Sequence, residues 1–292
     1  MKLFSVLRIA RPSSTAIARR GAGFCACMLL VAFVVSLALT GSALAAPPAV
    51  LATGQLAQVA PGDFIFRVVD LTLDPSDQVV THKHGAGMAY AINGAHVLTV
   101  DGKVTKLGPG QASWIGDQLT HSHATDGSGP THFLFMYLWP ASQKGAPMGP
   151  GFRDAKVAFE SDVLSIANRQ AKDIQLVDTA LEAGQDSGTQ SYAGPTLLNV
   201  QSGKFTLKTG DTSRSMQTGD FAMVQAGTAV QLKSETAGHV LTLSVLPAGQ
   251  PQLLPQTGSP TSPVEPYVIP ALLGLALLAL GWVIHWRRSS SR

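Results

Sequence analysis

The chain has 292 residues, of which 45% are hydrophobic and 13% are charged, and its formal net charge is +3. The excess positive charge lies at the two ends, because residues 46–257 carry 13 Lys and Arg against 17 Asp and Glu, a net charge of about −4. Nucleic-acid binding needs clustered basic side chains, so we expect neither a nucleic-acid partner nor a nucleotide cofactor.

Residues 1–45 have the order of a secretory signal. Five basic residues between Lys2 and Arg20 precede an apolar run from about Phe24 to Leu39, and small residues follow, ending in Ala43-Leu44-Ala45. A positive region, an apolar region and an A-x-A site are typical of a cleaved signal helix, and the alternative is an uncleaved membrane anchor. Both cysteines lie inside this segment, so the exported body is expected to have no disulfide.

The body is predicted to be all-β. Short runs of Val, Ile, Leu, Phe and Thr alternate with clusters of Gly, Asp, Asn and Pro, as in Phe64 to Asp70 and Ala95 to Val100. This spacing is typical of a sandwich or a barrel. Residues 146–173 are predicted to link two β units, with a helix from Arg153 to Lys172, because three apolar residues there have near-helical spacing.

An internal repeat supports the division into two β units. Without gaps, Gly85 to Leu119 aligns with Gly194 to Thr228 at an offset of 109 residues. Glycines at 85, 94 and 110 recur at 194, 203 and 219, where tight turns or close backbone contacts require them. We therefore predict two copies of one β-barrel unit, in residues 46–145 and 174–249.

The C-terminal segments indicate a surface anchor. The linker 250–266 contains Leu254-Pro255-Gln256-Thr257-Gly258, which resembles the LPxTG sorting motif of Gram-positive-type surface proteins. An apolar run at 267–286, ~20 residues and long enough to cross a bilayer, and a basic tail at 287–292 follow it. The resemblance implies that a sortase joins Thr257 to the cell envelope, and the alternative is an ordinary membrane anchor. Both place the body outside, at the cell surface.

Two motifs in the first copy resemble those of the cupins, and specifically of the two-domain bicupins. The first runs from His82 to Met88, with Gly94 closing it, and the second runs from Gly110 to His121. The resemblance covers about 62–138 and again 174–247, and it implies two tandem jelly-roll barrels. The family's acidic ligand would fall at Gly87 or Met88, and neither residue has a carboxylate that could bind a hard cation.

The histidines of the first copy form a candidate metal site. His82 and His84 are two residues apart, so on a strand they share a face, and a facing strand could bring His121 to them. Three neutral imidazoles suit zinc, copper, iron or nickel. His123 has the same side-chain phase as His121 and is either an extra ligand or a partner that fixes a ligand's tautomer.

The second copy and two further histidines of the first copy are predicted to carry no metal ion. Adding 109 to 82, 84 and 121 gives Ser191, Ala193 and Val230, so the second copy lacks all three ligands. We expect His96 and His132 to be surface residues or paired barrel residues.

Three functions are compatible with this sequence. The first is a metal-dependent cupin enzyme of the oxygenase or isomerase type acting on a small oxygen-rich substrate, with Tyr90 and Asp117 as candidates for acid–base roles. The second is a metal-free extracellular module that binds a small molecule or a sugar. The third is a structural surface protein. The cupin resemblance also leaves a homodimer open, because many cupins pair through barrel edges.

Overall fold

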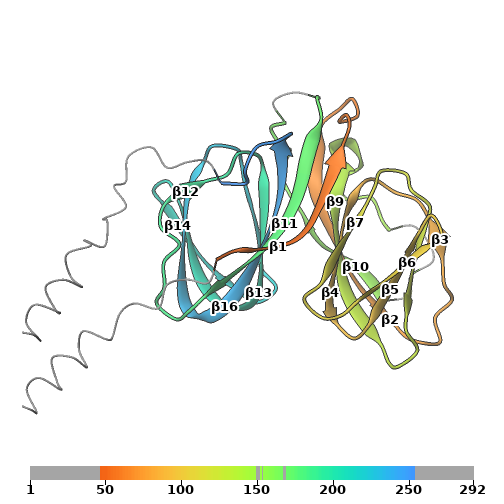
Figure 1. The fold of residues 1–292 in the computed structure, drawn as a ribbon. Helices are drawn as coiled ribbons and strands as arrows, with labels where there is room; N and C mark the ends of the chain where they lie inside the picture. Colours follow the sequence, from red (N-terminus) through yellow and green to blue (C-terminus); the bar gives the residue numbers. More distant parts are fainter. Residues whose placement is uncertain (1–46, 149–151, 153, 167–168, 254–292) are drawn as a thin grey trace, which may run out of the picture. The chain divides into compact units, whose positions relative to one another are not determined.

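The chain is described by a computed structural model over residues 47–148, 152, 154–166 and 169–253 (Figure 1). Within these ranges the regular structure is β-strand, apart from one short 3-10 turn at Ala141–Gln143, so the expected all-β class is confirmed. The described part of the chain contains no helix that is both long enough and apolar enough to cross a membrane. The predicted signal segment 1–45, sorting motif 254–258, membrane helix 267–286 and basic tail lie outside the described residues.

Strands β2 to β10 form two antiparallel sheets (Figure 1). The five-stranded sheet has the order β10-β2-β9-β4-β7, and the four-stranded sheet has the order β3-β8-β5-β6. Leu98 of the smaller sheet is buried in one cluster with Leu71, Ile115 and Phe133 of the larger sheet. The strand bounds are β2 Phe64–Leu73, β3 Thr81–His82, β4 Gly87–Asn93, β5 His96–Val100, β6 Lys103–Leu107, β7 Ala112–Ile115, β8 His121–Thr125, β9 Thr131–Pro140 and β10 Asp154–Glu160.

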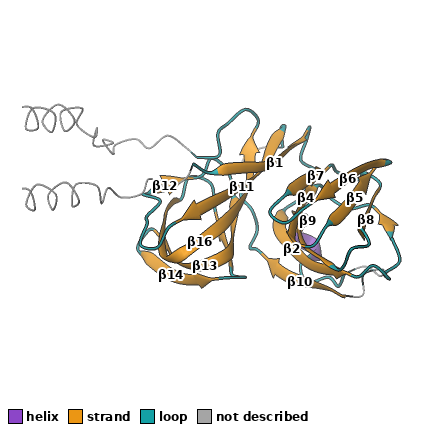
Figure 2. Cartoon of the chain, turned by 60° about the horizontal axis from the view of Figure 1, so that its bottom comes forward, coloured by secondary structure: helices purple, strands orange, loops and turns teal. Residues whose placement is uncertain are grey.

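The remaining strands form a seven-stranded sheet (Figure 2). Its main path is β1-β11-β16-β13-β14, while β12 pairs with β16 and β15 pairs with β13. Its own buried cluster includes Phe205, Val230 and Leu232. The strand bounds are β1 Ala49–Leu56, β11 Lys172–Leu181, β12 Gln190–Ser191, β13 Thr196–Thr209, β14 Thr212–Gln217, β15 Phe221–Val224 and β16 Ala229–Pro247.

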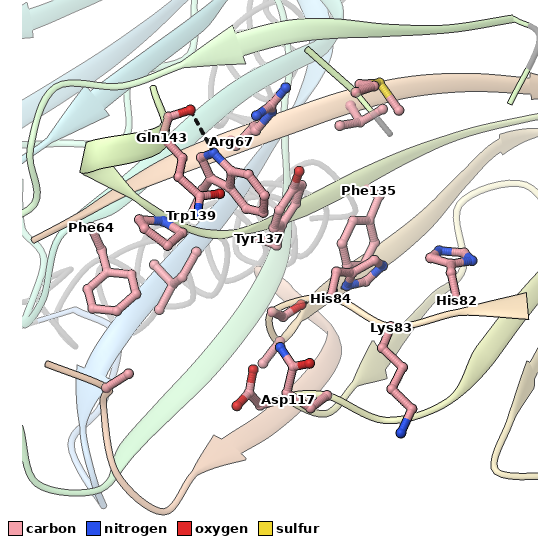
Figure 3. Close-up of a pocket in the computed structure, with 18 of the residues that line it drawn as sticks. Phe64, Arg67, His82, Lys83, His84, Asp117, Phe135, Tyr137, Trp139 and Gln143 are labelled. Carbon is pink, nitrogen blue, oxygen red and sulfur yellow. Dashed lines mark hydrogen bonds between the residues drawn. The ribbon is translucent and has the colours of Figure 1, made fainter. Parts of the chain in front are cut away.

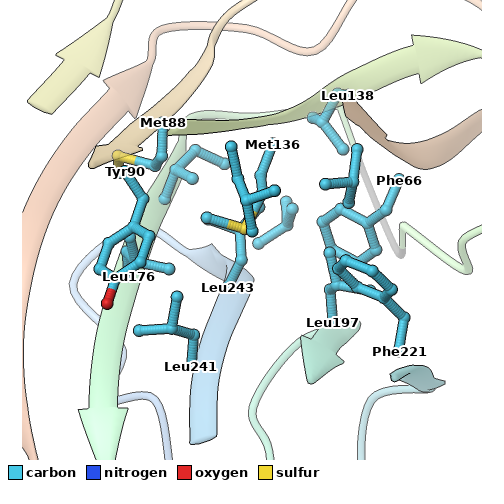
Figure 4. Close-up of a cluster of buried hydrophobic side chains, with 14 of the residues drawn as sticks. Phe66, Met88, Tyr90, Met136, Leu138, Leu176, Leu197, Phe221, Leu241 and Leu243 are labelled. Atoms are coloured by element: carbon cyan, nitrogen blue, oxygen red, sulfur yellow. The ribbon is translucent and has the colours of Figure 1, made fainter. Parts of the chain in front are cut away.

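A third cluster contains buried side chains from both groups of strands (Figure 4). Met88 and Met136 of β4 and β9 lie in it with Leu176 of β11 and Leu243 of β16. Each fully buried side chain of this kind contributes roughly 1.5–3 kcal/mol to folding. Strand β1 adds a second connection, because it precedes β2 in the sequence yet pairs with β11 in the seven-stranded sheet.

Strand positions follow the offset at which the sequence aligns with itself. Strands β3 and β12 begin at 81 and 190, β4 and β13 begin at 87 and 196, and β7 and β15 begin at 112 and 221. Each pair is separated by 109 residues. Gly94 and Gly203 also correspond, and both have positive φ, 72° and 86°. A Cβ atom there would lie 2.2 Å from Pro130 O and 2.8 Å from Ala237 O, so the backbone requires glycine at both positions.

The helix predicted from Arg153 to Lys172 is wrong. Residues Asp154–Glu160 form β10, an antiparallel neighbour of β2 with a bulge between Val157 and Phe159. Beyond the strand, Phe66 donates its backbone N–H to the Ser161 hydroxyl at 2.9 Å. The physical reason is that β2 would otherwise present an unpaired edge, and pairing with it outweighs a weak local helical pattern.

Candidate metal centre

Two short strands bring the predicted histidines together. His82 on β3 pairs directly with His121 on β8, and His84 follows two residues after His82. The backbone N–H of Gln118 donates to His84 O at 3.0 Å, which holds the loop after β3 against the loop before β8. His123 lies two residues after His121 on the same strand, so both side chains share one face.

The four imidazoles form one compact group. One ring nitrogen of each of His82, His84, His121 and His123 lies within 4.8 Å of the others. The ring centroids of His82 and His84 are 4.3 Å and 4.2 Å from that of His121. Spacing predicted that His82 and His84 lie together, the motif resemblance added His121, and His123 was expected to be either a ligand or a partner. The fold brings all four together.

Backbone carbonyls fix the orientation of three of the rings. The Nδ1 atoms of His82, His84 and His121 lie 3.2, 2.8 and 2.9 Å from the carbonyl oxygens of Val80, Gly85 and Leu119 respectively. A carbonyl oxygen only accepts hydrogen bonds, so each Nδ1 must carry the proton of its neutral ring. The lone pair of each ring is therefore on Nε2.

Two of these lone pairs face each other. His84 Nε2 and His121 Nε2 are 2.8 Å apart, a hydrogen-bond distance between two atoms that both act as acceptors. Such a contact is repulsive unless a proton or a metal cation lies between the nitrogens. The donor set fits a divalent transition metal, since neutral imidazole nitrogens bind zinc, copper, iron and nickel.

Burial disfavours the proton as the bridge. It lowers the pKa of His84 to about 3, against the raising effect of the hydrogen bond to Gly85, and the neighbouring His121 and His82 lower the pKa further. Burial also lowers the pKa values of His82 and His121. All three rings are therefore neutral at pH 7, so a bound metal ion is the remaining way to stabilise the two facing nitrogens.

His123 differs from the other three in its partner. It is only 4% exposed, and its Nδ1 lies 3.0 Å from Nε2 of His96, a side chain with 0% exposure. Of the alternatives expected for His96, a surface residue is wrong, because the side chain is buried and paired with His123, but its contact with the site was missed. The repeat contained the signal, because position 96 corresponds to Phe205, a core residue of the second copy.

A cavity of about 670 Å³ opens beside the cluster (Figure 3). It reaches His82, His84 and His123, whereas His121 is not among its lining residues. Phe135, which contacts the ring of His84 at 4.2 Å between centroids, begins a row of aromatic side chains. Tyr137 and Trp139 continue this row, with centroid spacings of 4.9 and 5.5 Å.

The far end of the row is closed by a buried cation. Arg67 is 1% exposed, and its Cζ atom lies 5.0 Å from the centroid of the Trp139 ring. Its Nη2 atom donates to Ala146 O at 2.6 Å. Its Nε atom lies 3.5 Å from a carboxylate oxygen of Glu160, which compensates its charge. Arg67 is thus a structural part of the cavity wall.

The structure separates the two residues considered for acid–base roles. Asp117 lines the cavity, but Tyr90 lies in the cluster that also contains Met88 and Leu176 (Figure 4). Tyr137 is the tyrosine that lines the cavity instead. Burial raises the pKa of Tyr137 to about 12, so it is a neutral phenol at pH 7.

The second copy has no comparable histidine group at the corresponding positions. Ser191 and Ala193 replace the first pair, while Val230 and Leu232 replace His121 and His123. Val230 is 1% exposed and Leu232 is 2% exposed, and both belong to the hydrophobic cluster of the seven-stranded sheet. The same strand positions therefore hold a polar cluster in one copy and apolar core in the other.

His132 and His239 lie outside the group. His132 Nε2 is 2.6 Å from Asp70 Oδ1, and His239 Nδ1 is 2.9 Å from Asp178 Oδ2. Each of these histidines is paired with a carboxylate at the surface of a sheet, as expected for His132.

No family model and no curated protein sequence matches this chain. Among solved structures, salicylate 1,2-dioxygenase from Pseudaminobacter salicylatoxidans is similar at 14% identity with a TM-score of 0.45, covering 61% of this chain and 70% of that one. A cupin 2 conserved barrel domain protein from Leptotrichia buccalis is similar at 12% identity with a TM-score of 0.39, covering 66% and 88%. Likenesses this weak carry no functional argument, and the candidate metal centre rests on its own geometry.

Proposed function

We propose that the chain is a bicupin whose first barrel, formed by β2 to β10, binds one divalent transition metal through His82, His84 and His121. The observation that carries the proposal is the 2.8 Å contact between the Nε2 atoms of His84 and His121, whose Nδ1 atoms are both committed to carbonyl oxygens. The second barrel, formed by β1 and β11 to β16, has apolar or small residues at these positions and is structural in this proposal.

A bound ion would supply Lewis-acid chemistry or, for iron and copper, electron exchange. The protein's own residues perform three tasks. The carbonyls of Val80, Gly85 and Leu119 hold the three rings with their lone pairs on Nε2. The cavity is large enough for a small molecule beside the cluster, and its aromatic wall favours a ligand with an apolar face. This arrangement fits a metal-dependent oxygenase or isomerase.

The second candidate function is a binding module with no catalytic step. The cavity, at about 670 Å³, is large enough for a small molecule with or without an ion. A ligand-induced thermal shift that persists in a chain with His84→Ala and His121→Ala would favour this module over a metal-dependent enzyme.

We also propose that this body is displayed at the cell surface, with the membrane, a sortase and the cell envelope as partners. The order of signal segment, sorting motif, apolar span and basic tail in the sequence supports this localisation. It gives the cavity access to small molecules outside the cell.

Elemental mass spectrometry tests the metal proposal. The full chain is purified in mild detergent, without chelators and without a histidine tag, and is compared with the double variant His84→Ala/His121→Ala. A second double variant, His132→Ala/His239→Ala, is the matched control because it removes two histidines outside the cluster. We expect about one ion per chain in the wild type and in the control, and none in the first variant. Equal metal content in all three, or none after loading, would contradict the proposal.

A further inference from the structure

The hydrogen bond between His123 and His96 determines which nitrogen of His123 carries its proton. One of two arrangements must hold between two neutral rings: either His96 Nε2–H donates to His123 Nδ1, or His123 Nδ1–H donates to His96 Nε2. In the first, His123 presents an Nε2–H group to the cluster. In the second, it presents a lone pair and could bind a metal ion.

The other nitrogen of His96 distinguishes these arrangements. Among the described residues, His96 Nδ1 is buried and has no hydrogen-bond partner. In the second arrangement this atom would be a buried, unpaired N–H donor, whereas in the first it is only an unused lone pair. Orphaned buried N–H groups are the rarer and costlier defect in proteins, so the first arrangement is favoured.

We propose that His96 is a positioning residue that holds His123 as a hydrogen-bond donor, so that His123 is not a fourth metal ligand but donates from Nε2 to an acceptor oxygen of a ligand in the cavity. Two observations agree with this role. His123 lines the cavity whereas His121 does not, and the rings of Phe133 and His96 pack on His123 at 5.0 and 5.1 Å between centroids. The inference rests on the proposed function and names its ligand class: small molecules with a carbonyl, carboxylate or phenolate oxygen.

Nuclear magnetic resonance of the ring nitrogens tests the inference directly. The full chain is labelled with nitrogen-15 at histidine, and two-bond proton–nitrogen correlations are recorded without metal and with one equivalent of zinc. We expect His82, His84 and His121 to carry their proton on Nδ1, and His123 to carry it on Nε2 in both samples. A His123 protonated on Nδ1 in the zinc-loaded chain would overturn the inference. Absence of zinc binding would instead contradict the proposed function, while the metal-free spectrum would still decide the tautomer.

Two variants of His96 test whether this residue sets the tautomer. His96→Phe follows Phe205 of the second copy, where the same position accommodates a phenyl ring, and it removes the partner of His123. His96→Gln retains an amide that can donate to His123 Nδ1. We expect His123 to remain protonated on Nε2 in the Gln variant and to exchange between both forms in the Phe variant. Identical His123 spectra in the Phe variant and the wild type would show that His96 has no positioning role.

The affinity for zinc shows whether His123 is a metal ligand or a hydrogen-bond donor. His123→Leu follows Leu232 of the second copy, and zinc affinity is measured by competition with a chromophoric chelator. We expect the variant to lose no more than about tenfold in affinity, the lower end for residues outside the ligand set, while His121→Ala loses more than about a hundredfold. Equal losses in the two variants would identify His123 as a fourth ligand and refute the inference.

Discussion

His82 and His121 are paired residues of one antiparallel ladder, β3 with β8, and this ladder is only two residue pairs long. The candidate metal centre therefore joins elements that have little other pairing to each other. An ion that binds only the folded chain stabilises it by mass action, by about 2.7 kcal/mol at a concentration near a hundredfold above the dissociation constant.

Zinc is therefore expected to raise the thermal unfolding temperature of the full chain. Differential scanning calorimetry with and without zinc measures the effect, and the rise should disappear in His121→Ala. The control His132→Ala should retain it, because that residue pairs with Asp70 away from the cluster. A rise of the same size in His121→Ala would place the zinc elsewhere.

The stability of the metal-free chain should fall in acid. Burial lowers the pKa of His84 to about 3, below the value of about 6.5 expected in the unfolded chain. Between these pH values the unfolded chain binds a proton that the folded chain does not, so the free energy of unfolding decreases as the pH falls from about 6.5 towards 3. Urea unfolding in the presence of a chelator measures this slope. The slope should be smaller in His84→Leu, and an unchanged slope would show that His84 is not held neutral by the fold.

Gly54 should be intolerant of any side chain. A Cβ atom at this position of β1 would lie 2.0 Å from Cδ2 of Trp114 on β7, so Gly54→Ala must displace the indole or the strand. Overpacking of this kind costs roughly 1–3 kcal/mol, which denaturant unfolding can measure. Gly129→Ala is the matched control, because nothing lies within 4 Å of its added Cβ. Equal stability of the two variants would mean that β1 does not pack on Trp114.

The sorting motif makes a separate prediction about attachment. In a host with a sortase, the wild-type chain should remain in the cell-envelope fraction after boiling in detergent. Thr257→Ala should move it to the detergent-soluble fraction, because Thr257 is the residue to be joined to the envelope. Gln256→Ala is the control, since this position of the LPxTG pattern varies. Release of the wild-type chain by detergent alone would indicate an ordinary membrane anchor.

The parts of the fold that could be predicted are those carried by local pattern and by repetition. Alternation and turn residues predicted an all-β chain, and three pairs of strands begin 109 residues apart, the offset of the sequence alignment. Spacing alone placed His82 with His84, and the motif resemblance added His121. These predictions succeed because strand periodicity fixes which side chains share a face.

The errors concern contacts between distant segments. Local spacing around Phe159 predicted a helix, but the unpaired edge of β2 recruits that segment as β10. Tyr90 was considered for an acid–base role, yet it lies in the shared hydrophobic cluster. His96 contacts His123 from a neighbouring strand, a relationship that only the comparison with Phe205 of the second copy could have suggested.

Anomalous diffraction from zinc-soaked crystals of the chain tests the central claim most directly. The account predicts one strong anomalous peak in contact with the Nε2 atoms of His82, His84 and His121, with the three Nδ1 atoms still bonded to the carbonyls of Val80, Gly85 and Leu119. No peak at that position, in crystals that show zinc bound elsewhere, would contradict a metal centre in the first barrel.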